Sequence, residues 1–503
     1  MLHHKLLTLG LVLTSSMLLS ACGGSSSNSG ISDSTAPTAS HIFPNNNHGI
    51  HSKKVIISGQ AADETALESV VVNYAENSIV ADLNNGFFTA KIDAIPGENT
   101  YYVVVTDKAK NQTTIEESFY FGARASAGGA HSGIIKNERI YAWGRNNKGQ
   151  SGIGAITKLR DDPLTHPISP TLISVPSDDI AATETKFVSL AFNQNSSTAL
   201  DVNGYVWSWG DGDNGQLGLG IAEDGIVDET DYNSPQKVPN VSDIVAISRG
   251  GGHCLLLKAD GTVLAFGYNA QGQLGDGSNT DKDTVVTVNG LTNIVQISAS
   301  STSYAIDEEG RLWGWGSNDD GQLANGVKDT DAHNIPTQIA IDEPVVSIAS
   351  GNGHALALTE SGKVYAWGLN FSSQVGMRTS EVWAEDILTP KLLPWFDDAI
   401  AVWAKGNQSF AQRSDGKIYP WGQNMLGTLG IEQDDDVEAP NNPILALDNV
   451  TDLGNGALHT IALRNDGSVF SWGWSFEGSL GGGEEMINFW GYRLPVLLSI
   501  SED

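Results

Sequence analysis

One string recurs seven times along the later part of this 503-residue sequence. Each copy starts as a short alternating run that ends in an aromatic residue and Gly, and most continue into a Gly-Gln-Leu-Gly-like stretch, as in "VWSWGDGDNGQLGLG" (206–220). The aromatic residues lie 49 to 66 positions apart, at Trp143, Trp209, Phe266, Trp315, Trp367, Trp421 and Trp472. A period of about 50 residues is typical of propellers and other repeat arrays, in which each repeat forms one small sheet.

Each repeat contains the signals of four short strands. The stretch "VVSIASGNGHALALTESGKVYAWG" (345–368) reads as a strand, a Gly-rich turn, a second strand, a Ser-Gly hairpin turn and the aromatic strand. Gly supplies the positive φ that such hairpin turns require. A variable loop and an apolar run with Pro follow, which predicts the fourth strand. The aromatic residues alternate between the two faces of the sheet, where adjoining sheets need large side chains to fill the space between them.

These seven copies resemble the repeat of the regulator of chromosome condensation family. The resemblance covers residues 123–503 and implies a seven-bladed β-propeller. We therefore predict an all-β chain. How the two ends of the propeller meet does not follow from the pattern.

One position in every repeat holds a polar side chain. It lies thirteen residues before the aromatic residue in six copies and twelve before it in the first, at His131, Ser196, His253, Thr302, His354, Gln408 and His459. One interpretation is a ring of groups near one end of the central channel that binds a ligand. The other, which we favour, is a set of hydrogen bonds that tie each blade to the backbone of its neighbour. Metal binding is not expected, because these histidines belong to different blades.

Residues 36–122 have a different pattern, with about seven short β-branched and aromatic runs between Gly, Pro, Asn and Asp. This predicts a small β-sandwich. The order of the runs resembles bacterial immunoglobulin-like domains, which act as spacers or adhesive modules. In this stretch Asp63, Asp107 and Asn111 could hold Ca²⁺, but we expect them to cap turns.

The N-terminus indicates export. Residues 1–21 contain an apolar core that is short for a bilayer span, and "LSAC" ends in Cys22. This resembles the lipobox of bacterial lipoproteins, and the resemblance implies cleavage before Cys22, acylation of its thiol and anchoring to the cell envelope. Gly23 implies the outer membrane. Residues 22–35 are rich in Gly and Ser and predict a flexible tether.

The charge of the chain argues against nucleic-acid binding, and its second cysteine is expected to have a structural role. The net charge is −31, which disfavours DNA or RNA as a partner because phosphate backbones would be repelled. The second cysteine, Cys254, lies in an apolar strand and is expected to be a buried free thiol.

No motif of nucleophilic, metal-dependent or phosphate-transfer catalysis is present in the sequence, so we predict a protein that is not an enzyme and has no cofactor. The string "DGDNG", with Asp211, Asp213 and Asn214, weakly resembles a Ca²⁺ loop. It lacks the expected final Glu and occupies the ordinary turn of the repeat. Ca²⁺ therefore stays a minor alternative.

The variable loops differ most between repeats. They span 222–235, 378–390, 432–443 and 483–495, and all leave the same strand end, so they should gather on one face of the disc. Their aromatic residues are candidates for protein binding, because Trp and Tyr dominate interface energetics; they are Tyr232, Trp383, Phe489, Trp490 and Tyr492. The alternative is that these aromatic residues pin down long loops.

The sequence is compatible with four functions. We favour an envelope-anchored scaffold lipoprotein, expected to be monomeric, that binds an unidentified protein partner. The second is an enzyme acting on polysaccharide. The third is a guanine-nucleotide exchange factor, for which the widest gap between repeats, 154–206, is the one candidate for a GTPase-contacting wedge. The fourth is inhibition of a secreted enzyme, because a soluble member of the repeat family inhibits β-lactamases.

Overall fold

The structure is a computed structural model of the whole chain. It describes residues 33–157, 166–175, 185–220, 230–377, 385–433, 435–487 and 490–500. The predicted signal peptide, Cys22 and most of the expected tether lie outside these ranges. Among the described residues, no helix has the length and hydrophobicity of a membrane span.

Two packed sheets form the N-terminal unit, in agreement with the predicted sandwich architecture. One sheet has the order β1-β3-β7-β6 and the other β2-β9-β8-β4-β5. The strands are β1 (Thr38–Phe43), β2 (His48–Ile50), β3 (Lys54–Ala62), β4 (Leu67–Tyr74), β5 (Asn77–Val80), β6 (Asp82–Asn84), β7 (Phe87–Asp93), β8 (Gly97–Asp107) and β9 (Gln112–Phe121). Strand β7 shows why they pack: its residues alternate between exposed and buried, and Phe88, Ala90 and Ile92 enter the core between the sheets.

Seven further sheets follow in chain order, each built from consecutive strands. The first three are β10 (Ala125–Ala127), β11 (His131–Lys136), β12 (Arg139–Gly144) and β13 (Thr171–Leu172); β14 (Phe187–Phe192), β15 (Ser196–Asp201), β16 (Val206–Gly210) and β17 (Tyr232–Lys237); and β18 (Ile244–Arg249), β19 (His253–Lys258), β20 (Val263–Gly267) and β21 (Lys282–Thr287). Neighbouring strands pair antiparallel, as the predicted hairpins require.

The remaining four sheets repeat the same order. They are β22 (Ile294–Ala299), β23 (Thr302–Asp307), β24 (Leu312–Asn318) and β25 (Asp329–Ile339); β26 (Val345–Ser350), β27 (His354–Thr359), β28 (Val364–Gly368) and β29 (Ile387–Leu392); β30 (Ala399–Lys405), β31 (Gln408–Arg413) and β32 (Ile418–Gly422); and β33 (Val450–Asn455), β34 (His459–Arg464), β35 (Val469–Gly473) and β36 (Tyr492–Leu498). In the described loops there are three short 3₁₀ helices, η3 (Asp213–Gly215), η4 (Met425–Gly427) and η5 (Glu484–Met486).

The sixth sheet departs from the predicted four strands. In the described part of the chain it has three strands, and an isolated bridge between Gly422 and Val437 stands where the fourth strand pairs in the other sheets. After this bridge, Ile444 N donates to Ile418 O at 2.9 Å without forming a strand.

The repeat tryptophans lie between successive sheets. All six are fully buried, and the indole of each packs against the preceding sheet, as Trp209 does against Ile135 and Ile140. Each indole nitrogen also donates to a backbone carbonyl of the preceding sheet, at 2.9 Å from Trp209 Nε1 to Gln150 O. The aromatic residue therefore fills the space between sheets and fixes their spacing with one hydrogen bond.

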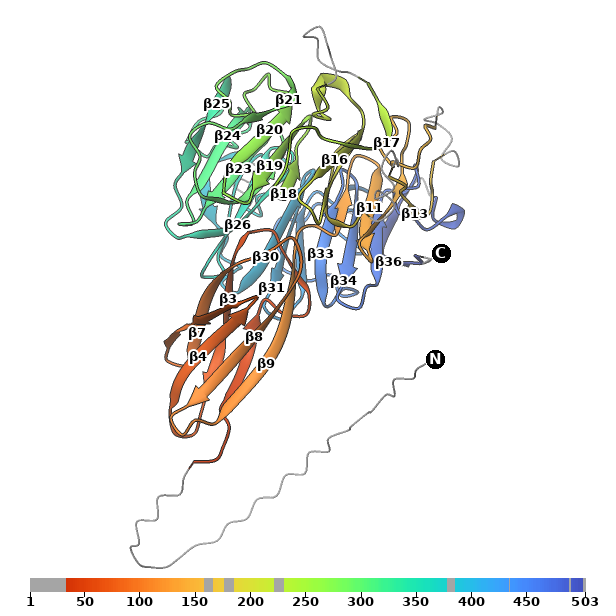
Figure 1. Cartoon of the computed structure of the whole chain (residues 1–503). Helices are drawn as coiled ribbons and strands as arrows, with labels where there is room; N and C mark the ends of the chain where they lie inside the picture. Colours follow the sequence, from red (N-terminus) through yellow and green to blue (C-terminus); the bar gives the residue numbers. More distant parts are fainter. Residues whose placement is uncertain are drawn as a thin grey trace, which may run out of the picture.

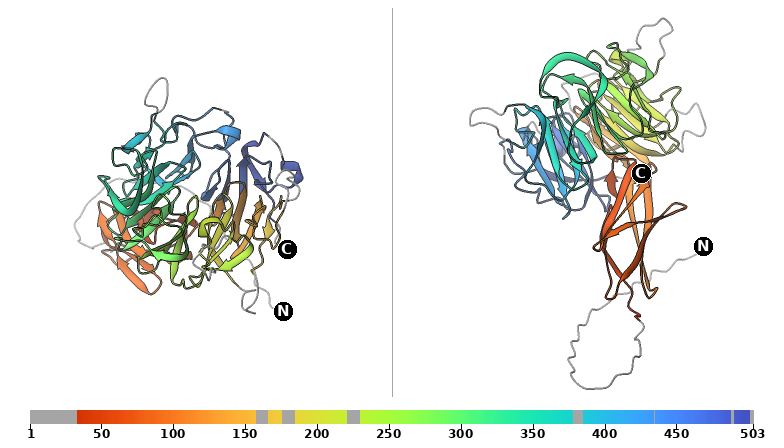
Figure 2. Two further views of the ribbon diagram at one scale, coloured as in Figure 1. Left: turned by 90° about the horizontal axis from the view of Figure 1, so that it is seen from above. Right: turned by 90° about the vertical axis from the view of Figure 1, so that its left-hand side faces the viewer.

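The seventh sheet packs against the first, so the sheets form a ring (Figure 2, left). Trp143 Nε1 donates to Ser479 O at 2.8 Å, and Ala457 N donates to Gly128 O at 3.0 Å. The two sheets at this seam share no strand among the described residues. Closure therefore uses a Trp-to-carbonyl hydrogen bond like those at the other junctions that have a repeat tryptophan.

The sandwich projects from one face of the ring (Figures 1 and 2). The backbone of Lys53 donates to Val295 O at 2.8 Å, and Tyr120 Oη donates to Val188 O at 3.1 Å. Both acceptors lie near the start of an innermost strand, which defines this side as the sandwich face.

Candidate functional site

The opposite side of the ring, which we call the loop face, is where the variable loops emerge. The innermost strand of each sheet runs from the sandwich face to the loop face, and the third strand runs the same way: Gly210, at the end of β16, pairs with Ser196 beside the end of β14. Every loop that follows a third strand therefore leaves on the loop face. The sandwich does not cover this side.

The predicted polar ring lies at the loop-face end of the central channel, where the innermost strands turn into the second strands. All seven members are buried, with at most 1% of their surface exposed. They are His131, Ser196, His253, Thr302, His354, Gln408 and His459.

All four ring histidines hydrogen-bond to a serine hydroxyl of the next sheet. The distances from imidazole Nε2 to Oγ are 2.9 Å for His131–Ser197, 2.8 Å for His253–Ser303, 2.8 Å for His354–Ser409 and 2.7 Å for His459–Ser132. Each serine in turn donates to a backbone carbonyl of the preceding sheet, as Ser409 does to Gln374 O at 2.7 Å. A hydroxyl has a single hydrogen, so the imidazole must be the donor and Nε2 carries its proton.

These bonds support the structural interpretation of the ring but differ from it in the partner. The Nε2 bonds of the histidines end on side chains, whereas the expectation was a bond to the neighbour's backbone; the backbones of Gln408 and His131 also interact with His354 and His459. The expectation describes Gln408 directly, because its side chain donates to Ala457 O at 3.2 Å. Thr302 donates within its own sheet, to Ser317 O at 2.6 Å.

The sequence contains a signal for this pairing that the spacing of the repeats alone does not indicate, namely the residue after each ring position. The residue directly after each ring position is Ser in the sheet that follows a histidine: Ser132, Ser197, Ser303 and Ser409. In the sheets that follow Ser196, Thr302 and Gln408 it is Cys254, Ala355 and Thr460. A ring histidine in one sheet is therefore always accompanied by this serine in the next sheet, and the other ring residues are not.

Burial holds these histidines neutral. It lowers the pKa of His253 and His354 to about 3 and that of His459 to about 4, and the pKa of His131 falls well below its usual value. Desolvation of the charged imidazolium is the main cause in all four. Within the described ranges, the side-chain groups close enough to share a metal ion are carboxylates only.

Arg249 replaces the regular contact between the second and third sheets. The third sheet has Phe266 and Cys254 where others have Trp and Ser, so the two regular donors to the Gln216 carbonyl are missing. Arg249 Nη2 donates to Gln216 O at 2.7 Å and to Ser196 Oγ at 2.6 Å. The guanidinium is buried, and its oxygen partners, the hydroxyls of Ser196 and Thr198 and the carbonyl of Gln216, are uncharged.

The weak Ca²⁺ loop is occupied by a lysine. The carboxylates of Asp211, Asp213 and Asp231 lie together, and Lys148 Nζ approaches them at 3.3, 3.7 and 3.1 Å. Asn214 has a positive φ in the turn and is not part of the cluster. Lys148 comes from the preceding sheet, so its ammonium stands where a cation would bind.

The sandwich candidates form a turn-capping network. Asp63 Oδ2 accepts from the backbone of Thr65 at 2.8 Å, and Asp107 Oδ1 accepts from the backbone of Asn111 at 2.8 Å. Asp33 joins them through Thr65 Oγ1 at 2.8 Å. Capping accounts for these contacts, as the sequence predicted, although the three carboxylates lie within reach of one ion.

The five loop aromatics separate into three groups. Tyr232 and Tyr492 lie in strands and pack against the core, and Tyr492 Oη also donates to Glu485 O at 2.9 Å. These two match the alternative in which aromatic residues pin the loops. Trp490 has 77% of its surface exposed on the loop face. Trp383 and Phe489 lie outside the described residues.

A further set of loop-face residues was not singled out from the sequence. The tip of the turn after each third strand holds an apolar residue in three successive sheets, Phe371, Met425 and Phe476. Phe371 is 69% and Met425 47% exposed, and Phe476 lies 6.2 Å from Trp474 between ring centroids. The corresponding positions in the second and fourth sheets are Asp213 and Asp319. The apolar tips thus belong to the fifth, sixth and seventh sheets, and acidic tips occur in the second and fourth.

Cys254 is buried and free, as expected, and burial raises its pKa to about 11. It is therefore a structural thiol and not a nucleophile.

The model of the RCC1-like domain matches residues 219–498, which is more than half of the chain. This chain belongs to the RCC1-like domain family. The match begins in the second sheet and extends to the last strand, so it covers most of the ring.

Curated relatives of the RCC1-like family agree. The chain is 29% identical to the ultraviolet-B receptor UVR8 of Arabidopsis thaliana over 371 residues, which cover 72% of this chain and 79% of that protein. It is 30% identical to the mouse regulator of chromosome condensation, covering 59% of this chain and 75% of that one. It is 28% identical to human E3 ubiquitin-protein ligase HERC2 but spans 7% of that protein.

Solved structures show the same fold. Prp20p of Saccharomyces cerevisiae, crystallised in work on its binding to Gsp1p and histones, aligns with a TM-score of 0.58 and 22% identity over 84% of this chain and 95% of its own. Human WBSCR16 aligns with a TM-score of 0.58 and 18% identity over 79% of this chain. The chain is therefore an all-β protein with an RCC1-like propeller, and such a domain indicates a protein-interaction or regulatory role. The names of UVR8 and of the mouse regulator describe a receptor and a regulator, not enzymes.

Proposed function

We propose that this chain is an envelope-anchored lipoprotein that binds a protein partner through the loop face of its propeller. Acylation of Cys22, the outer-membrane location and the monomeric state belong to this proposal. So do the identification of the seven sheets as a closed seven-bladed propeller and of the sandwich as an immunoglobulin-like spacer.

The placement of the sandwich supports the proposal. Its strand β8 begins at Gly97 beside Val188 of the ring and ends at Asp107, beside Asp33 and Asn111. Eleven residues of strand span about 35 Å. The first described residue of the chain is thus at the end of the sandwich remote from the propeller (Figure 2, right). A chain anchored upstream of this point would present the loop face away from the membrane.

The chemistry of the loop face suits a protein partner. Exposed Phe371, Met425 and Trp490 can provide apolar contact, because aromatic residues and Met are enriched in interface cores. Exposed Asp319 favours a partner with basic residues near its apolar contact, whereas Asp213 already lies 3.7 Å from Lys148.

The test is differential capture by the full-length chain, purified in detergent. Wild type and the variant Phe371→Ala/Met425→Ala/Trp490→Ala are immobilised and exposed to solubilised envelope and medium proteins. Phe87→Ala serves as the control, because Phe87 is 58% exposed on the sandwich. We expect a protein that is retained by wild type and by Phe87→Ala and lost with the triple variant. Equal retention by all three would refute binding through the loop face.

A further inference from the structure

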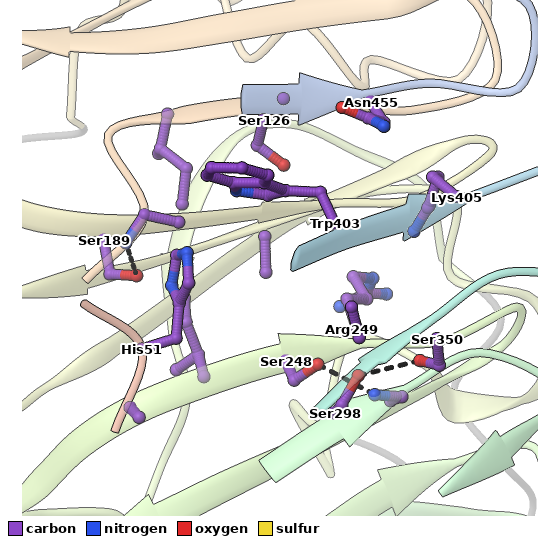
Figure 3. Close-up of a pocket in the computed structure, with 18 of the residues that line it drawn as sticks. His51, Ser126, Ser189, Ser248, Arg249, Ser298, Ser350, Trp403, Lys405 and Asn455 are labelled. Carbon is purple, nitrogen blue, oxygen red and sulfur yellow. Dashed lines mark hydrogen bonds between the residues drawn. The ribbon is translucent and has the colours of Figure 1, made fainter. Parts of the chain in front are cut away.

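A cavity lies on the axis of the ring, between the innermost strands (Figure 3). Its volume is about 190 Å³. Residues of the sandwich and of the link to the ring, including His51, Phe121 and Ala123, close it on the sandwich face. At the other end it is lined by the last residues of the innermost strands, among them Arg249, Ser350, Lys405 and Asn455.

The charges in this cavity are opposite to the charge of the chain. Arg249 and Lys405 are lining residues, and no Asp or Glu is among the described residues that line it. The chain as a whole has 59 acidic and 28 basic residues. In a chain with twice as many acidic as basic residues, a cavity lined by two cations and no carboxylate is unexpected. The positive potential of these cations favours binding of an anion in the cavity.

Neither cation forms an ion pair with a carboxylate among the described residues, although the charge of the more distant Asp211 acts on Arg249. Within the described ranges, the hydrogen bonds of Arg249 go to Ser196, Thr198 and Gln216 O. The one polar contact of Lys405 Nζ there is with Phe192 O at 3.5 Å. Burial, reinforced by the charge of Arg249, lowers the pKa of Lys405 to about 8. An anion between the two would relieve both effects.

Buried donors without partners complete the site. Asn455 and Trp403 each have 7% of their surface exposed. Both side-chain polar atoms of Asn455 and the Trp403 indole nitrogen have no hydrogen-bond partner in the part of the chain that the structure describes. A buried donor without a partner is costly, and such groups are usually satisfied by water or a ligand. Figure 3 shows both side chains at the cavity, with Lys405 from the same strand as Trp403, β30, and Arg249 from β18.

We propose that the axial cavity binds a small oxyanion of the phosphate or sulfate class. Arg249 and Lys405 supply the positive charge, and Asn455 Nδ2 and Trp403 Nε1 supply neutral donors. The cavity is smaller than the roughly 300–1,000 Å³ typical of sites for drug-sized ligands, so the ligand is a small ion and not a nucleotide.

The experiment measures the thermal unfolding of the full-length chain in detergent with increasing inorganic phosphate at constant ionic strength. A ligand that binds the folded state raises the melting temperature in a saturable way. We expect this rise in wild type, a similar rise with sulfate, and none with chloride or acetate. In Lys405→Met the apparent affinity for phosphate should fall by about tenfold or more.

Two comparisons keep the result interpretable. Lys417→Met removes a lysine from an exposed hairpin turn and should keep the wild-type response to phosphate. Without phosphate, Lys405→Met should unfold at a temperature no lower than wild type, because it removes an uncompensated charge from a buried position. Should it fold poorly, Asn455→Ala takes its place.

The proposal is wrong if phosphate and sulfate leave the wild-type melting temperature unchanged, or if Lys405→Met responds as wild type does. A response to acetate but not to phosphate or sulfate would also overturn the assignment, in favour of a carboxylate ligand. Neither result depends on the loop-face partner.

Discussion

At the scale of single residues, the pairing of His in one sheet with Ser in the next is the main regularity of the ring. Each pair keeps one imidazole neutral and buried while its serine bridges back to the preceding sheet. The three junctions without this pair use other solutions, such as Gln408 with Thr460, whose hydroxyl donates to Thr428 O at 3.2 Å.

Stability should therefore depend on pH through these histidines. Their folded pKa values lie below the value of about 6.5 for an unfolded histidine, so the unfolded state binds more protons as the pH falls. Their contribution is present above about pH 6.5 and is lost as the pH falls toward the folded pKa values. When the pH falls from about 7.5 to about 5.5, each histidine should lower the free energy of unfolding by about 1 kcal/mol. Urea unfolding at the two pH values measures this change.

The histidine at one junction can be tested by exchanging pairs. His354→Gln with Ser409→Thr copies the natural Gln408–Thr460 arrangement, and should lower the proton uptake on unfolding at about pH 5.5 by about one. The reciprocal change, Gln408→His with Thr460→Ser, should raise it by about one. A pH profile that is the same in all three proteins would contradict the assignment.

Which residues could be predicted follows from how local their contacts are. The ring positions were found because they recur at a fixed distance from the repeat aromatic residue. Lys148 was missed because it enters the Asp211 cluster from another repeat, and Lys405 because one basic residue at the end of an apolar strand has no pattern. Of the loop aromatics, sequence could not separate Tyr492, which is packed, from Trp490, which is exposed.

At the scale of elements, the junction between the second and third sheets depends on a single side chain. Arg249→Met should leave Gln216 O without its donors and lower the free energy of unfolding by about 2 kcal/mol, since a buried acceptor would be unsatisfied. Adding Cys254→Ser and Phe266→Trp restores the two donors that the other junctions use and should recover part of the loss. Chemical denaturation of the three proteins measures this, and no recovery would show that Arg249 acts in another way.

The seam between the seventh and first sheets has a steric requirement. Gly481 has a φ of +76°, and a Cβ there would lie 2.7 Å from Trp143 Nε1. Gly467 has a φ of +80° and open space around it. Gly467→Ala should cost about 1 kcal/mol from backbone strain alone. Gly481→Ala should cost several-fold more in thermal or urea unfolding, because the indole must move, and equal costs would mean that the seam tolerates displacement.

The elements themselves were largely predictable, since each repeat has its own turn and aromatic signals. The fourth strand of the sixth sheet was not, because Val437 pairs there as an isolated bridge in a run rich in Asp, Glu, Pro and Asn. The β-sandwich architecture followed from alternation along short strands such as β7.

At the scale of the whole molecule, the sandwich is fixed to the ring by more than its covalent link. Arg124 Nη2 donates to Asn47 O at 2.9 Å in the sandwich and to Thr451 Oγ1 at 3.0 Å in the seventh sheet. The guanidinium also stacks on the ring of Tyr120 at 4.5 Å. Sequence could not place the sandwich, because many of its contacts end on backbone carbonyls, such as Val295 O and Val188 O, which any residue can offer.

The whole chain should therefore unfold in one calorimetric transition. Arg124→Ala should lower the stability of the junction by about 1–3 kcal/mol and separate the sandwich from the ring into two transitions. Arg139→Ala, at an exposed position of β12, is the control and should keep the single transition. Two transitions in the wild type would mean that the units are independent.

The backbone at Arg124 and Ala125 also affects how a pulling force would pass from the sandwich to the ring. The backbone nitrogens of Arg124 and Ala125 donate to Asp452 Oδ2 at 2.6 and 3.1 Å, so the segment that enters the first sheet is also bonded to the seventh. Tension applied between the N-terminal end of the sandwich and the loop face would thus reach both sides of the seam at once. Under such tension the first and seventh sheets would move together. The junction between them, which has no covalent connection, would then carry little of the force that would separate its two edges.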